Sequence, residues 1–223
     1  LFRSRYKERR KYRFSAGISE ISPRKLKQTF EAEVADRTPR DSFYHCLQNS
    51  AHQFHNKQGE NHYVLAGYPW FKCRARDLFV SLPGLTLAVD EQDEFEDVMV
   101  TAEKAIREFI SGEPSSYKIY EMEDPDVLLW AVWALQQYAK ETSREQCRQK
   151  YGRLLEDIMD YIRSRKHDNL FLHENGLLYA NGTEKAITWM NSTVNGRPVT
   201  PRTGYIVEVN SLWYNALRFI ADL

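Results

Sequence analysis

Three polar stretches of the sequence combine aromatic rings with carboxylates or arginines. Aromatic faces stack on the C–H faces of a pyranose ring, while carboxylates and guanidinium groups form strong hydrogen bonds with its hydroxyl groups. The pattern therefore favours a sugar site. The side chains concerned are Tyr68, Trp70, Phe71, Arg76 and Asp77 in the first stretch, Glu121, Glu123, Asp124 and Asp126 in the second, and Glu174, Glu184, Trp189, Asn191, Arg202 and Glu208 in the third.

Each stretch by itself also has a simpler interpretation. Tyr68 and Trp70 are residues that often belong to an apolar core, and Asp77 follows an arginine with which it could form an internal ion pair. Asp124 precedes an apolar run in the manner of a helix N-cap, and Glu208 suits the positive end of a helix. It is the presence of three such stretches in one chain that favours a binding site.

The loop "AITWMNSTVNG" places Asn191 where an acidic side chain would be the natural candidate for an acid catalyst. An amide forms good hydrogen bonds but cannot donate a proton as a general acid. Other chemistries have little support, since the chain contains no G-x-x-x-x-G-K-[ST], H-E-x-x-H or G-x-S-x-G motif. His167 and His173 are too far apart to be ligands on one helical turn and are predicted at the surface. No metal or cofactor is predicted.

The composition narrows the classes of partner. Thirty-one basic residues balance 31 acidic ones, so no net field favours nucleic acid or a membrane surface, and neither is predicted as a partner. No run approaches the roughly 18 apolar residues of a membrane span. The three cysteines lack metal-ligand spacing and favour a reducing compartment. Without a signal-peptide pattern at its start, the chain is predicted to be cytoplasmic.

Residues 1–40 are basic and polar and are predicted to be a linker or the tail of an upstream domain, since the sequence starts on Leu1 and not on Met. Residues 41–223 are predicted to form the folded domain, with the long loop 164–209 as a place for a site. The oligomeric state stays open.

Two kinds of helical pattern alternate in the domain. Residues 124–139 are apolar nearly all round and should be buried on most sides, with Asp124 as N-cap and Pro125 at the first helical position. Segments 76–88 and 210–221 have the same character.

The second kind of helix carries a single apolar stripe. It is predicted at 93–110 and again after Ser143, which forms a capping-box pattern with Gln146. "YIVEV", residues 205–209, is the only convincing strand. The alternation of buried and surface helices indicates hairpins arranged in two concentric rings, an all-α architecture.

Four motifs together carry a family resemblance: "AGYPWF…RD.F…LPGL", "D…LW..WALQQY", "GLLYANGTEKAITWM" and "NGRPVTPRTG..VEVNSLWYNAL". Over residues 40–223 the chain resembles the C-terminal amylo-α-1,6-glucosidase region of glycogen debranching enzymes. The resemblance implies a partial (α/α)6 toroid, roughly half of which is present. It also implies hydrolysis of the α-1,6-linked glucose of glycogen limit dextrin, with inversion. Inversion requires an acid and a base about 6.5–9.5 Å apart.

Carried over by this resemblance, Asn191 stands where the family has an aspartate that looks like the general acid. The resemblance places the partner carboxylate beyond residue 223. Arg74-Ala75 replaces the family's usual Trp-Gly, which removes a stacking ring. The matching positions, which would line the glucose pocket with Arg76 and Asp77 holding hydroxyl groups, are Tyr68, Trp70, Arg76, Asp77, Trp130, Trp189, Arg202 and Glu208.

General acid catalysis contributes about 10²–10⁴ in rate, so the chain as it stands is predicted to be inactive or nearly so. Its partner would be a branched α-glucan, glycogen or limit dextrin. The alternatives are a glucan-binding remnant without turnover, another inverting glycosidase such as a trehalase-like enzyme, and a helical scaffold for protein contacts. Half a toroid would also leave 124–139 facing water, an apolar surface larger than monomers usually expose.

Overall fold

The computed structural model describes residues 22–35, 37–68 and 70–223, and the chain divides into two compact units, residues 1–50 and 51–223. In the first unit, helix α1 (Leu26–Ala35) buries none of its residues. Helix α2 (Phe43–His52) follows, and its last two residues belong to the second unit. Inside the first unit, the Asn49 amide donates hydrogen bonds to the carbonyl oxygens of Thr38 (2.7 Å) and His45 (2.8 Å). Residues 1–21 of the predicted linker lie outside the described residues.

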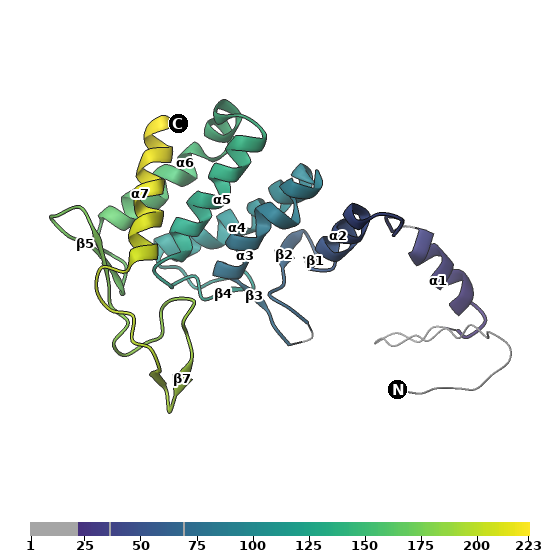
Figure 1. Ribbon diagram of the computed structural model, residues 1–223, viewed down its shortest axis with the longest axis horizontal. Coiled ribbons are helices and arrows are strands. Elements are labelled where there is room, and N and C mark those ends of the chain that lie inside the picture. The colour runs from purple at the N-terminus through teal and green to yellow at the C-terminus, as the bar shows by residue number, and fades with distance from the viewer. Residues whose placement is uncertain (1–21, 36, 69) are drawn as a thin grey trace. The chain divides into compact units, whose positions relative to one another are not determined.

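The second unit is mainly helical (Figure 1). Its helices are α3 (Ala75–Leu85), the short 3-10 helix η1 (Leu87–Val89), α4 (Gln92–Ser111), α5 (Val127–Glu141), α6 (Arg144–Arg163) and α7 (Val207–Asp222). Over the described parts of both units, the chain has seven α-helices. This content is consistent with a helical glycosidase domain.

Short strands connect the helices as four two-stranded sheets within the described residues. The antiparallel pairs are β1 (His55–Gln58) with β2 (Asn61–Val64), β5 (Leu170–Leu172) with β6 (Leu178–Ala180), and β7 (Thr193–Val194) with β8 (Arg197–Pro198). The parallel pair is β3 (Cys73–Arg74) with β4 (Ile119–Tyr120). Figure 1 places β3, β4 and β7 beyond one end of the helices, the end at which α7 begins.

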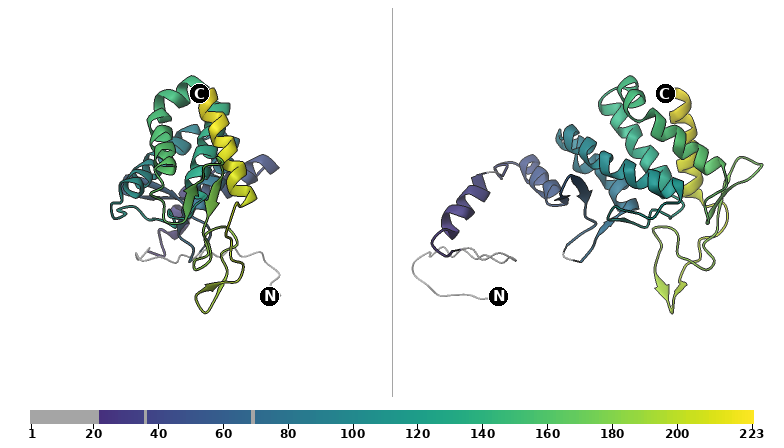
Figure 2. Two further views of the ribbon diagram at one scale, coloured as in Figure 1. Left: turned by 90° about the vertical axis from the view of Figure 1, so that its left-hand side faces the viewer. Right: turned by 180° about the vertical axis from the view of Figure 1, so that it is seen from behind.

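Helix α5 forms the centre of the second unit. It packs against α3, α6 and α7, and the two views in Figures 1 and 2 show α3 on one side of it and α7 on the other. Leu129, Val132 and Leu135 are among its nine buried residues, while Trp130 and Trp133 are half-buried. The prediction that this helix is apolar because it is buried is confirmed. The prediction that it would face water in this chain is wrong, because three neighbouring helices already cover it.

The amphipathic helices are confirmed with their stripes. Helix α4 buries Phe95, Val98, Met99, Ala102 and Ile106, among others, and α6 buries Tyr151, Leu154, Leu155, Ile158, Met159 and Ile162 along with Cys147 and Tyr161. The Ser143 hydroxyl accepts a hydrogen bond from the Gln146 backbone amide at 3.1 Å, as a capping residue should. The Gln146 side chain instead donates to the hydroxyl of Tyr138 at 3.0 Å. The cap is therefore half of the predicted capping box.

One predicted helix start and one predicted strand are wrong. Helix α5 begins at Val127 and not at Pro125, because the Asp124 carboxylate is bound by an arginine far away in the chain and does not cap the helix. "YIVEV" is not a strand, since α7 begins at Val207. In α7, helical spacing places Val209, Leu212, Trp213 and Ala216 on the buried side, and this burial outweighs the strand preference of β-branched residues.

His167 is also not at the surface as predicted, since it is only 4% exposed. Its Nδ1 accepts a hydrogen bond from the Asn169 backbone amide at 3.0 Å, and its ring lies edge-on to those of Phe109 and Tyr161. Burial lowers the pKa of His167 to about 4, so the ring is neutral at pH 7.

Candidate functional site

Two short parallel strands bring the first and second polar stretches together. In the β3–β4 pair, Arg74 lies opposite Tyr120, and α3 starts directly after β3. The chain leaves β4 through Glu121, whose φ of 63° turns the backbone toward the start of α5. Residues about 50 positions apart in sequence therefore face each other at one end of the helices.

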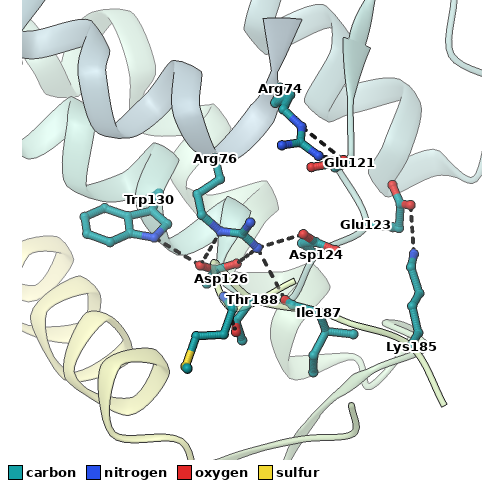
Figure 3. A network of polar contacts seen from close by, with 11 residues as sticks. Arg74, Arg76, Glu121, Glu123, Asp124, Asp126, Trp130, Lys185, Ile187 and Thr188 are labelled. Carbon is teal, nitrogen blue, oxygen red and sulfur yellow. Dashed lines mark hydrogen bonds and ion pairs between the residues drawn. The ribbon is translucent and has the colours of Figure 1, made fainter. Parts of the chain in front are cut away.

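Arg76 is the centre of a buried ionic network (Figure 3). Its Nε and Nη2 donate to the two carboxylate oxygens of Asp126, each at 2.8 Å, and Nη2 also donates to Asp124 Oδ2 at 2.7 Å. The backbone carbonyl of Ile187 accepts a further bond from Nη2 at 3.3 Å. The indole of Trp130 donates to Asp126 Oδ2 at 3.2 Å. The side chains of the arginine and the two aspartates are 11%, 6% and 4% exposed.

The charges of this network are unbalanced, because one guanidinium serves two buried carboxylates. Burial raises the pKa of Asp124 to about 6, against the lowering effect of Arg76, and the negative charge of Asp126 adds to the rise. Burial alone would lower the pKa of Arg76, but the two carboxylates outweigh it and raise that pKa further above its ordinary value. Arg76 is thus permanently charged, while Asp124 titrates near neutral pH.

Beside this network lies a cavity of about 290 Å³, close to the lower end of the range of about 300–1,000 Å³ that is usual for small-molecule sites. Residues of all three polar stretches line it, among them Arg74, Glu121, Glu123, Asp124, Lys185 and Asn191. Two ion pairs stand in its wall: Arg74 binds Glu121 at 2.6 Å, and Lys185 binds Glu123 at 2.9 Å. The structure thereby joins half-buried Asn191 to the carboxylates of the second stretch.

A second group of predicted residues meets at the start of α7. Glu208 Oε1 accepts a hydrogen bond from the Trp189 indole at 3.2 Å and also from Arg202. Arg202 Nη1 lies 3.0 Å from the sulfur of Met190. Burial would raise the pKa of Glu208, but the helix backbone, Trp189 and Arg202 outweigh burial and lower it. Trp189 is 63% exposed, so its ring face is available for stacking.

Tyr68, Trp70 and Asp77 do not join either group. Tyr68 and Trp70 are 58% and 79% exposed, so the alternative that they are core aromatics is wrong. The Tyr68 hydroxyl donates to the backbone carbonyl of Gln53. Asp77 is exposed in the first turn of α3, and the ion pair considered for it with Arg76 does not form, because Asp124 and Asp126 hold that arginine.

Two residues of the cavity wall were missed in the sequence as parts of a site. Lys185 follows Glu184 in a loop with no local pattern, and only its pairing with Glu123 reveals it. Arg74 was noted only because it stands where the family has a tryptophan. The structure places it in the cavity wall, where its guanidinium binds Glu121. Asp124 was taken for a cap; the signal against this was the second aspartate two residues later, which favours a shared basic partner.

Comparison with protein families gives one result. A family model described as amylo-alpha-1,6-glucosidase matches residues 47–223, which include every residue of both groups and the three exposed side chains. No curated protein and no solved structure matches the chain. Over the part of the chain that the structure describes, each helix is too short or too polar to cross a membrane.

Proposed function

This chain belongs to the amylo-α-1,6-glucosidase family, and from that premise we propose that the cavity beside Asn191 receives the α-1,6-linked glucose of a branched glucan. The observation that carries this proposal is that Asn191 lines one cavity with Glu121, Glu123 and Asp124. Carboxylates and an amide are suitable partners for the hydroxyl groups of glucose. Trp189 would offer an exposed ring at the same end of the helices.

The proposal includes the architecture that the family resemblance implies. Helices α3–α7 would form part of an (α/α)6 toroid, with α3, α5 and α7 in its inner ring. The central position of α5 and the gathering of β3, β4 and β7 at one end of the helices support this arrangement (Figure 1). In such a ring, loops at one end of the inner helices surround the substrate, which is where Asn191 and the carboxylates lie.

We further propose that the chain binds glucan but hydrolyses it slowly or not at all. An inverting glycosidase must protonate the leaving oxygen, and the amide of Asn191 has no proton of suitable acidity. Asp124 has a pKa of about 6, but its Oδ2 is held by Arg76 at 2.7 Å. The role we assign to Asp124 is therefore to position the cavity wall and not to transfer a proton.

Binding is tested with a branched oligosaccharide against a linear one of the same size, by calorimetry on the full chain. We expect the branched sugar to bind more tightly, and Asn191→Ala to weaken its binding by about tenfold, the loss of one or two hydrogen bonds. Asn175→Ala, in an exposed turn that does not line the cavity, is the matched control and should bind as the wild type does. Equal affinity for both sugars, or equal loss in both variants, would refute binding at this cavity.

Hydrolysis is tested separately, as glucose released from a phosphorylase-trimmed limit dextrin. The wild type should release no glucose above a heat-inactivated control. In a longer form of the protein that includes the base, which the family resemblance places beyond residue 223, Asn191→Asp should raise the rate by about 10²–10⁴ if the acid is what the site lacks. Turnover by the wild type at the rate of this variant would show that Asn191 is not at the acid position. A variant that binds but stays inactive would show that one substitution does not restore the chemistry.

A further inference from the structure

A second polar cluster lies on elements that take no part in the cavity. Strand β1 carries His55, strand β2 carries His62, and the first two turns of α4 carry Glu94 and Asp97. Helix α4 packs on β2, and the His62 backbone amide donates to the hydroxyl of Thr101 at 2.9 Å, which fixes the hairpin along the helix. Spacing in the sequence predicts no metal site here, because the four side chains come from three separate elements.

Three of the four side chains, His62, Glu94 and Asp97, have ligand atoms close enough together for a single bound ion, and His55 lies next to Glu94. Glu94 Oε1 lies 3.2 Å from His55 Nδ1 and also 3.2 Å from His62 Nδ1. His62 Nδ1 lies 3.8 Å from Asp97 Oδ2, and the ligand atoms of His62, Glu94 and Asp97 all lie within 4.8 Å of one another. Ligands that surround a tetrahedral zinc ion at about 2.0–2.1 Å are separated from each other by about 3.3 Å.

The hydrogen bonding of His55 supports a cation between these atoms. Its Nε2 lies 3.4 Å from the backbone carbonyl of Leu85, a partner that requires the proton to be on Nε2. Nδ1 then presents its lone pair toward the Glu94 carboxylate, and this atom is buried without a hydrogen-bond partner. Two acceptors that face each other need a positive centre between them, either a second proton on the ring or a bound cation. A histidine that donates one ring N–H to a carbonyl group is also the usual arrangement of a metal ligand.

We propose that His62, Glu94 and Asp97, with Asp97 at the open side, bind one divalent transition-metal ion of the zinc class, and that His55 completes the site beside Glu94. Two imidazole nitrogens and carboxylate oxygens are ligands that Zn²⁺ accepts, whereas Mg²⁺ and Ca²⁺ prefer oxygen ligands alone. Both histidine side chains are only 13% exposed and Asp97 is 58% exposed, so an ion would enter from the Asp97 side. The ion would join the β1–β2 hairpin to α4. It would be structural, and its presence does not depend on whether the chain binds glucan.

The proposal is tested by titrating the full chain with ZnSO₄ after removal of metal with a chelator. The titration uses a Cys46→Ser background, because the exposed Cys46 thiol could bind zinc independently. We expect one equivalent of Zn²⁺ to bind and to raise the unfolding temperature, with no such shift in MgCl₂. His62→Gln and Glu94→Gln should each weaken zinc binding at least about tenfold.

His52→Gln is the matched control. The His52 side chain lies at the surface, where its Nε2 contacts Glu91 Oε1 at 3.0 Å. The substitution therefore removes a histidine–glutamate pair without touching the cluster. Its affinity for zinc should equal that of the background chain. Absence of zinc binding in the background chain would overturn the proposal, as would zinc binding that survives both cluster substitutions or is lost equally in His52→Gln. Circular dichroism verifies that each variant is folded, and Glu94→Gln, the more exposed position, serves if His62→Gln does not fold.

Discussion

Removing the Arg76 side chain should destabilise the domain far more than removing its neighbour Arg74. Arg76→Met leaves Asp124 and Asp126 as buried carboxylates without their cation, a change that typically costs about 3–5 kcal/mol in unfolding free energy. Arg74→Met breaks the bond to Glu121, but those two side chains are 35% and 34% exposed. Water can solvate them after the pair is broken, so this loss should be about 0–1 kcal/mol.

Thermal and urea unfolding at pH 7 measure the difference. In a domain of this size about 1 kcal/mol corresponds to about 2–4 °C, so Arg76→Met should lower the unfolding temperature by about 6–20 °C and Arg74→Met by less than about 4 °C. The pKa of Asp124 is about 6 in the wild type, where Arg76 lowers it, and removing Arg76 raises it further. At pH 5 the carboxyl group is therefore protonated in both chains, and the penalty of Arg76→Met should shrink there. The reasoning is refuted if the two variants agree within about 1 kcal/mol at pH 7, or if the gap is the same at pH 5.

Three further predictions concern stability, each measured by urea unfolding. His167 has a pKa of about 4 in the folded chain against an ordinary value of 6.5. As the pH falls, this histidine therefore binds a proton in the unfolded chain before it does so in the folded chain. Stability should therefore fall, by on the order of 3 kcal/mol, as pH drops from 6.5 to 4. His167→Gln should abolish that part of the slope, and parallel pH curves would contradict it. Gly182→Ala would place a Cβ 2.5 Å from the carbonyl oxygen of Arg202, so a loss of about 1–3 kcal/mol is expected, and a neutral effect would contradict this close approach. Leu135→Ala, at a fully buried position of α5, should cost about 2–5 kcal/mol, and a loss below 1 kcal/mol would contradict the central placement of that helix.

The sequence predicted those helices that bury one side, because their apolar residues recur at helical spacing. The stripes of α4 and α6 are local properties of the sequence, and both helices form where they were expected. The β1–β2 hairpin was missed, because β1 and the first half of β2 are polar and only Gly59, with φ of 63°, marks the turn. The start of α5 was misplaced because Asp124 has its partner at Arg76, 48 positions away in the sequence, and no local pattern reports such a contact.

The sequence predicted which types of residue form the site, but not how these residues are arranged. Rings, carboxylates and arginines identified the three stretches, and a cavity does join parts of all three. Their pairing depends on tertiary contacts: Arg76 is held inside the protein, while Trp70 stands in solvent. The role expected for Arg76, holding sugar hydroxyl groups, stays a prediction. In the structure its Nε and Nη2 already donate hydrogen bonds to the protein's own aspartates.

The ion pairs that hold the cavity wall do not include Asn191, the residue at the expected acid position. Glu121, Glu123 and Asp124 each have a basic partner, Arg74, Lys185 and Arg76 respectively, so the wall is held by ion pairs to which Asn191 does not contribute. Exchange of an acid for an amide at position 191 would thus leave those pairs intact. It would also lower the negative charge next to Asp124, whose carboxyl already titrates near neutral pH because of its burial. A carboxyl group at position 191 would face these same carboxylates, and like charges raise a pKa, which is the condition that a general acid requires. For this reason the loss of one proton donor can abolish hydrolysis in our proposal while the cavity that recognises the sugar persists.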